Sequence, residues 1–378
     1  MLCGHTWAES NGSDSDACAD DLCGHEGHFR ALPPVRIVAT MKNPSSEFAS
    51  EAPLEPALPI CDAHHHLWER AGERYLLADF LQDAGCGHNV VATVAIECKA
   101  MYRKDGPEEL KPLGETEFLE SVANHVAADP SIATAVASAI VGFADLGLGD
   151  GVAGVLEAHM AASPDRFRGI RQSTTWDASG ALRNEAPRGF LSESSFRCGF
   201  ACLGRYKLSY DAWLYHPQLA ELAELARAFP AVSIILNHIG APLGVGPYAG
   251  KRAEVFEAWR EGVLRVAACP NVAVKLGGLG SERSGFDWHE RVAPPSSTEL
   301  AATLKPYIEL CIEKFGVDRC MFESNFPVEK RANSYVVVWN AFKRITANYS
   351  ESERAALFHD TAARIYRLGK RHSPPAEN

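Results

Sequence analysis

Eight short apolar or β-branched runs, separated by stretches of helical periodicity, constrain the fold of this chain more than any other feature. Strand and helix patterns that alternate in this way are typical of parallel βα units, and eight units close a (β/α)8 TIM barrel. With 378 residues, 46% of them hydrophobic, the chain is long enough to bury one core of that size. The sequence therefore predicts an α/β barrel with strands at 60–65, 90–97, 132–141, 167–172, 207–214, 233–239, 272–276 and 320–325.

Helices are predicted between these strands from apolar stripes. Leu219, Leu222, Ala223, Ala226 and Phe229 share one helical face that ends before Pro230, and a second stripe runs through 300–315. Ser350 and Glu353 have the spacing of a capping box, which predicts a closing helix that ends near Gly369.

The chain divides into three predicted regions. Residues 1–58 are rich in Ser, Asp, Ala and Pro and have no sustained period, which predicts a flexible N-terminal extension. Residues 59–371 form the barrel, and 372–378 form a disordered tail. Cys18, Cys23, His25 and His28 do not have a standard zinc-binding spacing, so we assign them to the disordered extension.

Charge and cysteine content narrow the classes of partner and compartment. A formal net charge of -11 disfavours nucleic acid and anionic membrane surfaces as partners. No segment has the length of a membrane span, and the first thirty residues lack the pattern of a signal peptide. Eleven scattered cysteines favour reduced thiols over a disulfide framework, so we expect a cytoplasmic protein.

Long connections follow the predicted strands, whereas short ones precede them. Residues 98–115, 173–197, 240–252 and 277–298 all come after strands. In a barrel such segments meet at the C-terminal face, where active sites are built. We therefore expect the chemistry at the strand ends.

The first strand carries a histidine pair. Side chains two residues apart point the same way, so Asp62, His64 and His66 are predicted to face inward and His65 outward. Two imidazoles on one face can chelate a metal ion, although paired histidines also occur as ordinary polar residues.

Five segments, in order, resemble the amidohydrolase superfamily, and most closely its branch of sugar-lactone and 2-pyrone-4,6-dicarboxylate lactonases. The resemblance covers about residues 59–369, and its segments are DAHHHLW at 62–68, FRGIR at 167–171, LNHIGAP at 236–242, VKLGG at 274–278 and FESNFPV at 322–328. It implies a metal-dependent-hydrolase-like barrel in which His64, His66 and His238 hold one divalent metal, with zinc as the first candidate. It also implies that Arg171 faces an anionic or carbonyl part of the substrate.

Asn325 departs from the family pattern, which has an aspartate at this position as metal ligand or general base. An amide cannot accept a proton near neutral pH, so that base role does not transfer. Glu323, one of the site histidines and Glu97 are the alternative bases. Metal-independent catalysis therefore stays open.

The long loops are expected to line the site with cationic and aromatic side chains, which suit a small anionic or sugar-like substrate. These are Tyr102, Arg103, Lys104, Trp176, Arg183, Trp288 and His289. Lys275, inside the barrel, requires a carboxylate partner such as Asp211, Glu323 or the substrate.

The leading functional hypothesis is a lactonase that opens a sugar-derived or carboxylated lactone. A metal-assisted decarboxylase of the same superfamily is the alternative, although the histidine that branch carries on its fifth strand is absent from residues 207–214. Asn325 motivates a third hypothesis, a catalytically inactive ligand-binding barrel. A homo-oligomer is left open.

Overall fold

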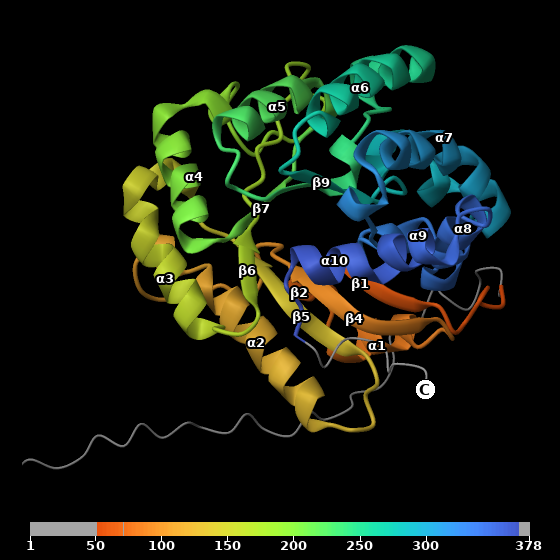
Figure 1. Cartoon of the computed structure of the whole chain (residues 1–378), viewed down its shortest axis with the longest axis horizontal. Helices are drawn as coiled ribbons and strands as arrows, with labels where there is room; N and C mark the ends of the chain where they lie inside the picture. Colours follow the sequence, from red (N-terminus) through yellow and green to blue (C-terminus); the bar gives the residue numbers. More distant parts are fainter. Residues whose placement is uncertain (1–50, 71, 370–378) are drawn as a thin grey trace, which may run out of the picture. The chain divides into compact units, whose positions relative to one another are not determined.

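The computed structural model describes residues 51–70 and 72–369, and an eight-stranded parallel sheet lies at its centre (Figure 1). Each strand pairs with the next along the chain, as the parallel βα units require. A parallel bridge between His65, in the first strand, and Phe326, shortly after the last strand, brings the two edges of the sheet together and closes the barrel. The strands are β1 (Pro59–His65), β4 (Asn89–Ile96), β5 (Ala135–Gly142), β6 (Phe167–Ile170), β7 (Ser209–Ala212), β8 (Ile234–Leu236), β9 (Val272–Leu276) and β10 (Cys320–Phe322).

Helices surround the barrel, and Figure 1 shows them following one another around the strands. They are α1 (Leu77–Ala84), α2 (Leu113–Ala128), α3 (Val152–Ala162), α4 (Ser194–Tyr206), α5 (Leu219–Ala228), α6 (Arg252–Ala267), α7 (Ser297–Phe315), α8 (Tyr335–Ile345), α9 (Glu351–Ala355) and α10 (Thr361–Ile365). The predicted barrel fold is confirmed, and α5 and α7 fall where the apolar stripes predicted helices. The capping box of Ser350 and Glu353 starts α9, but a π-helical turn over Ala356–Asp360 interrupts the closing helix.

Several strands end earlier than predicted, and beyond two of them the chain turns at a residue with positive φ. β8 ends at Leu236, and His238 follows it with φ 53°. β10 ends at Phe322, and Asn325 has φ 54°. Both residues belong to the predicted site, and such left-handed conformations cluster at functional sites.

One inward-facing prediction on β1 is wrong. Between Asp62 and His65 the register against β4 shifts, so β1 contains one extra residue there and its side-chain alternation breaks. Asp62 faces the helix layer instead, where it accepts hydrogen bonds from the Ser324 hydroxyl (2.6 Å) and from the Tyr335 hydroxyl of α8 (2.9 Å). His65 faces outward as predicted, against the ring of Phe80.

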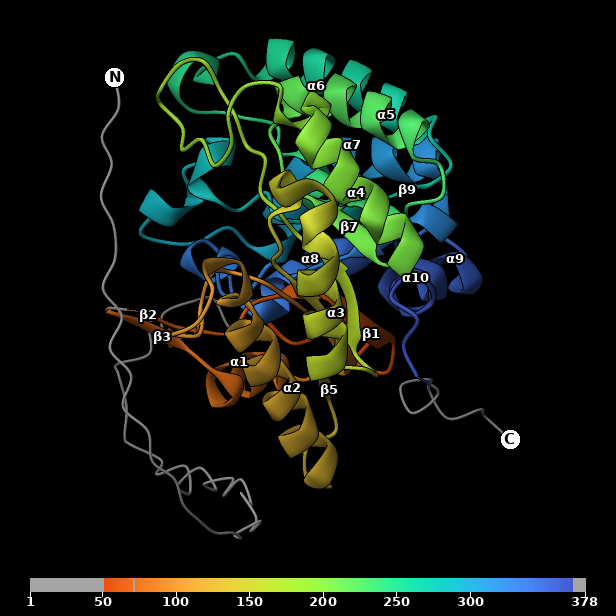
Figure 2. The same cartoon turned by 90° about the vertical axis from the view of Figure 1, so that its left-hand side faces the viewer.

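A small antiparallel hairpin, β2 (Trp68–Arg70) and β3 (Glu73–Tyr75), follows β1. Figure 2 shows this hairpin on the same, left-hand side of the barrel as the loops that follow β6 and β9. That side is the C-terminal face of the strands, where the site was expected.

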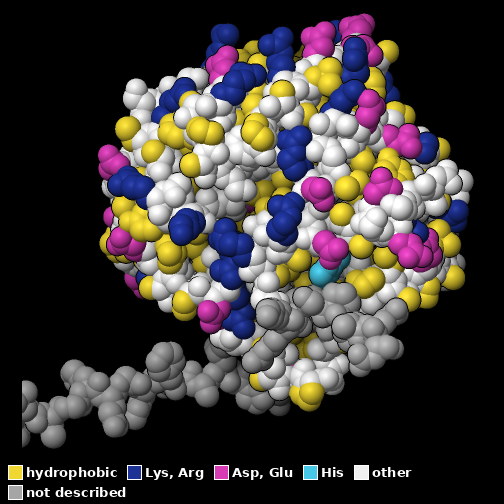
Figure 3. Space-filling view, in the orientation of Figure 1, with side chains coloured by type: hydrophobic (Ala, Val, Ile, Leu, Met, Phe, Trp, Pro, Cys, Tyr) yellow, Lys and Arg dark blue, Asp and Glu magenta, His cyan; other side chains and the backbone are white. Residues whose placement is uncertain are grey.

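Residues 51–58, which the sequence analysis assigned to the N-terminal extension, contact α8. Lys343 donates hydrogen bonds to the carbonyls of Leu54 (2.8 Å) and Glu55 (2.9 Å), and Asn340 donates to Glu51 (3.0 Å). The cysteines and histidines of residues 18–28 lie outside the described residues, as do the predicted tail residues 372–378. None of the helices within residues 51–70 and 72–369 combines the length and the apolar character of a membrane span. On the face drawn in Figure 3, basic and acidic side chains are interspersed.

Candidate active site

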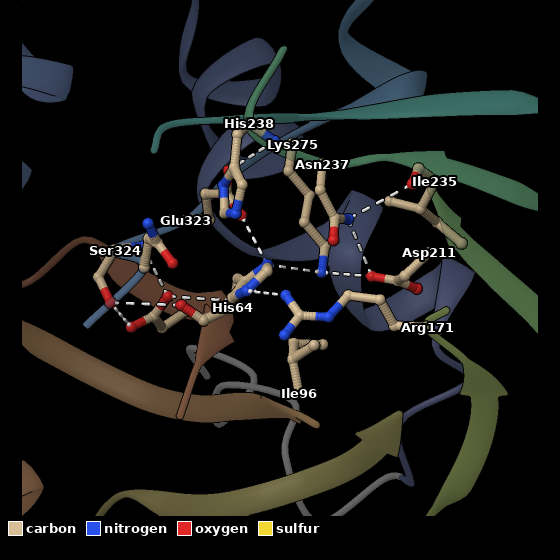
Figure 4. Close-up of polar contacts among 12 residues, drawn as sticks. His64, Ile96, Arg171, Asp211, Ile235, Asn237, His238, Lys275, Glu323 and Ser324 are labelled. Atoms are coloured by element: carbon tan, nitrogen blue, oxygen red, sulfur yellow. Dashed lines mark hydrogen bonds and ion pairs between the residues drawn. The ribbon is translucent and has the colours of Figure 1, made fainter. Parts of the chain in front are cut away.

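His64 and His66 lie in contact at the C-terminal end of β1 (Figure 4 shows His64). Their Nε2 atoms are 3.1 Å apart, and both side chains are buried. His66 Nδ1 lies 2.9 Å from the carbonyl oxygen of Ile96. Because a carbonyl only accepts, this contact places the His66 proton on Nδ1 and leaves its Nε2 lone pair facing His64.

Glu323 connects the first and last histidines of the predicted cluster. Its Oε1 accepts hydrogen bonds from Nδ1 (2.7 Å) and from the backbone amide (3.1 Å) of His238. Its Oε2 lies 2.9 Å from His64 Nδ1 and has no hydrogen bond of its own. Burial raises the pKa of the Glu323 carboxyl to about 8.

Arg171 lies at the end of β6, and all three nitrogens of its guanidinium contact other groups of the site. Nε donates to Glu97 Oε1 (2.7 Å), Nη2 donates to the Glu97 backbone carbonyl, and Nη1 lies 3.2 Å from His64 Nε2. Glu97, one of the alternative bases, is therefore held in an ion pair with Arg171. Glu97 thus holds the Arg171 guanidinium in a fixed position at the wall of the site.

Two glycines after β9 allow these groups to approach one another. A Cβ on Gly278, which has φ 73°, would lie 2.2 Å from His238 Nδ1. A Cβ on Gly277 would lie 2.5 Å from the backbone oxygen of Glu323 and 2.6 Å from its Cγ. The VKLGG segment therefore ends in two glycines because any side chain there would displace the His238–Glu323 pair.

Asn325 lies in the site with its amide oriented by Glu329. Nδ2 is 3.4 Å from Glu329 Oε1, and the backbone amide donates to the His64 carbonyl (2.9 Å). Burial raises the pKa of Glu329 to about 7. A carboxylate at position 325 would face a second one here, which gives a local reason for the amide.

Lys275 has the carboxylate partner that its burial requires. Nζ donates to Asp211 Oδ2 at 2.6 Å, and both side chains are fully buried. Asp211 also accepts hydrogen bonds from the Tyr366 hydroxyl (2.8 Å) and from Asn237 Nδ2 (3.1 Å). Lys275 Nζ lies 3.4 Å from His64 Nδ1, so this buried polar network supports the histidine cluster from beneath (Figure 4).

The donor set fits a divalent metal ion. Within the described residues, the ligand atoms of His64, His238 and Glu323 all lie within 4.8 Å of one another. Burial holds the pKa of both histidines well below the usual value, so their imidazoles are neutral, as metal ligands must be. Glu323 Oε2, which makes no hydrogen bond, supplies an oxygen donor, and a bound cation would keep this carboxyl ionised. The candidate ligands in this geometry are therefore His64, His238 and Glu323. His66, which the family resemblance implied as a ligand, lies beside this set in contact with His64.

A cavity of about 410 Å³ opens above this centre. His66, Glu97, Arg171, His238 and Asn325 form its base. Its remaining walls comprise Trp68, Arg70, Cys98, Lys99, Ser173, Arg183, Glu185, Trp213, Arg283 and Val328.

Most of the loop residues that the sequence analysis singled out do not line this cavity. Arg183 does, whereas Arg103 pairs with Glu117 at the surface and Trp288 is buried against Phe286. Two further lining residues, Trp213 and Arg283, were not predicted from the sequence. Trp213 lies two residues beyond the inward-facing Asp211, so strand alternation could have identified it; Arg283 belongs to an irregular loop that carries no periodic signal.

Comparison with known proteins agrees with the barrel and the histidine cluster. A family model described as amidohydrolase matches residues 61–368. The chain therefore belongs to the amidohydrolase family, and it is a hydrolase of that family.

Curated relatives of this chain include an uncharacterized protein, y4mH, from Sinorhizobium fredii, with 38% identity across 82% of this chain and 99% of that protein. An L-fucono-1,5-lactonase from Burkholderia ambifaria is 26% identical across 82% of this chain and 96% of that enzyme. Among solved structures, a zinc-bound amidohydrolase from Burkholderia multivorans aligns with a TM-score of 0.64 and 25% identity, across 82% of this chain and 99% of that one.

Proposed function

We propose that this protein hydrolyses small lactones, with water as the attacking group and His238 as the base. The observation that carries the proposal is the His238–Glu323 pair at the base of the cavity. Similarity to L-fucono-1,5-lactonases, at 26% and 28% identity, supports a lactone as the substrate.

The His238–Glu323 pair has the geometry of an oriented base. Glu323 Oε1 accepts the Nδ1 proton of His238, which leaves Nε2 as the nitrogen that takes a proton from water. The same Nε2 returns that proton to the ring oxygen when the tetrahedral intermediate collapses, so the product is a hydroxy acid.

Arg171 stabilises the oxyanion that forms when water adds to the carbonyl. Its guanidinium is held by Glu97 and needs no reorganisation during the reaction. His64, His238 and Glu323 would hold a divalent metal ion, with zinc as the first candidate. The ion would act as a Lewis acid toward the carbonyl and the water, and His238 would then be a ligand instead of the base.

Proton release on a panel of aldonolactones and dicarboxylate lactones tests the proposal, with the wild-type protein assayed before and after chelation and with added zinc. His238→Gln should lower kcat by about 100-fold or more, the usual contribution of a positioned base. His216→Gln is the matched control, because His216 is a buried histidine bound to the Leu243 amide outside the cavity. No turnover of any lactone, with or without metal, would refute the proposed function.

A further inference from the structure

Two groups of side chains with the same composition, each a histidine, a tryptophan and an arginine, lie between the site and the cavity walls. In one, the rings of His66 and Trp68 have centroids 5.9 Å apart, and the Arg70 guanidinium lies 4.5 Å from the Trp68 ring centroid. In the other, the His238 and Trp213 rings meet edge to face, with centroids 4.7 Å apart and an interplanar angle of 80°, and the Arg283 guanidinium lies 4.8 Å from the Trp213 centroid. All six side chains line the cavity, and in each group the tryptophan contacts both the site histidine and the cation.

Among the residues that the structure describes, Arg283 lacks the contact with a carboxylate that Arg171, Lys99 and Arg183 have. Arg171 pairs with Glu97, and both Lys99 and Arg183 pair with Glu185. Within the part of the chain that the structure describes, the Arg283 guanidinium has no hydrogen bond and no ion pair, and its contact is the face of Trp213. Five N–H donors that are partly withdrawn from water and unmatched by protein favour an acceptor supplied by a ligand.

Among residues 51–70 and 72–369, Arg70 likewise has no carboxylate in contact. It donates a hydrogen bond to the Cys98 carbonyl, which leaves its charge unneutralised. The cavity walls thus carry five cationic side chains and two carboxylates, in a protein whose formal net charge is -11. A positive cavity in a negatively charged molecule selects anions.

We infer that Arg283, assisted by Arg70, binds an anionic group of the substrate, a carboxylate or a phosphate, at the end of the molecule remote from the lactone carbonyl. The inference rests on the proposed function and names the substrate class. The Trp213 ring separates Arg283 from His238. The anionic group therefore lies several atoms from the carbon that water attacks. A guanidinium fork binds either oxyanion bidentately, and tryptophan keeps it in place.

Matched 1,5-lactones that differ only at the sixth carbon test this assignment. For gluco, galacto and manno configurations, the neutral hydroxymethyl, carboxylate and 6-phosphate forms are assayed with wild-type protein and Arg283→Met. We expect kcat/KM to be at least about tenfold higher for one anionic form than for its neutral counterpart, because one charge-assisted contact contributes more than about 1.4 kcal/mol. Arg283→Met should remove this preference, because it lowers kcat/KM for the anionic lactone by at least about tenfold more than for the neutral lactone. Comparing the lactones that carry a carboxylate with those that carry a 6-phosphate identifies which oxyanion the site prefers.

Arg252→Met is the control, because Arg252 stacks on Phe286 (3.9 Å) but lies outside the cavity. It should leave the preference for the anionic lactone intact. Equal rates for neutral and anionic lactones, or equal losses for both in Arg283→Met, overturn the inference and leave the lactonase proposal standing. If no lactone is hydrolysed, the proposed function fails, and calorimetry with the ring-opened dicarboxylates and 6-phosphates decides the inference. Binding that Arg283→Met abolishes supports it, and binding that is absent or unchanged overturns it.

Discussion

Removing the Lys275 ammonium should destabilise the protein strongly, because Asp211 would keep a buried charge. The pair is 2.6 Å long and both side chains are 0% exposed. In Lys275→Met the carboxylate retains two neutral donors, the Tyr366 hydroxyl (2.8 Å) and Asn237 Nδ2 (3.1 Å). Breaking a buried ion pair from one side costs about 3–5 kcal/mol, which is a large part of a typical total stability of about 5–15 kcal/mol.

Urea denaturation at pH 7, followed by circular dichroism and tryptophan fluorescence, measures this loss. The double variant Lys275→Met/Asp211→Asn removes both charges and should recover about 2–3 kcal/mol relative to the sum of the single variants. Lys305→Met is the matched control, because Lys305 pairs with Glu309 at the same 2.6 Å but in solvent, where such a pair contributes about 0.2–1 kcal/mol. A loss in Lys275→Met no larger than in Lys305→Met would refute this reasoning.

Three further predictions concern stability. Burial raises the pKa of Glu115 from 4.5 to about 8, so its contribution to stability is full below pH 4.5 and is lost as pH rises to 8, by at most about 1.4 kcal/mol per pH unit. Glu115→Gln should flatten the unfolding free energy over this range, and an unchanged pH profile would contradict the assignment. Asn325→Asp should lower the melting temperature more at pH 8 than at pH 5, because the new carboxylate faces Glu329; equal shifts at both pH values would argue against repulsion. A chain that starts at residue 59 should be about 1–3 kcal/mol less stable to urea than one that starts at residue 51, since Lys343 loses two carbonyl partners, and equal midpoints would show that this contact contributes nothing.

The fold could be predicted from the sequence because buried runs, several of them wholly apolar, alternate with segments of helical periodicity. The runs that became β4 and β9 are apolar enough to be recognised without their neighbours. The site histidines could be predicted for a related reason, since strand ends of a barrel converge on one face. The resemblance to a known family then indicated which histidines, on different strands, belong to one site.

Features that depend on backbone irregularity could not be predicted. The extra residue in β1 turns Asp62 toward Tyr335, and no property of the local sequence marks a bulge there. The left-handed turn at His238 brings its Nδ1 to Glu323, a pairing between residues 85 positions apart in the chain. Arg283 reaches the cavity from an irregular loop, so its stack on Trp213 follows from the tertiary fold alone.

Hydrolysis of a lactone in oxygen-18 water tests the central claim most directly, because the proposed chemistry adds water at the ring carbonyl. The account predicts that mass spectrometry finds one oxygen-18 atom in the carboxylate of the ring-opened product. It also predicts that His238→Gln slows the labelling by about 100-fold or more. Release of carbon dioxide without labelling, or labelling at the wild-type rate in His238→Gln, would contradict the account.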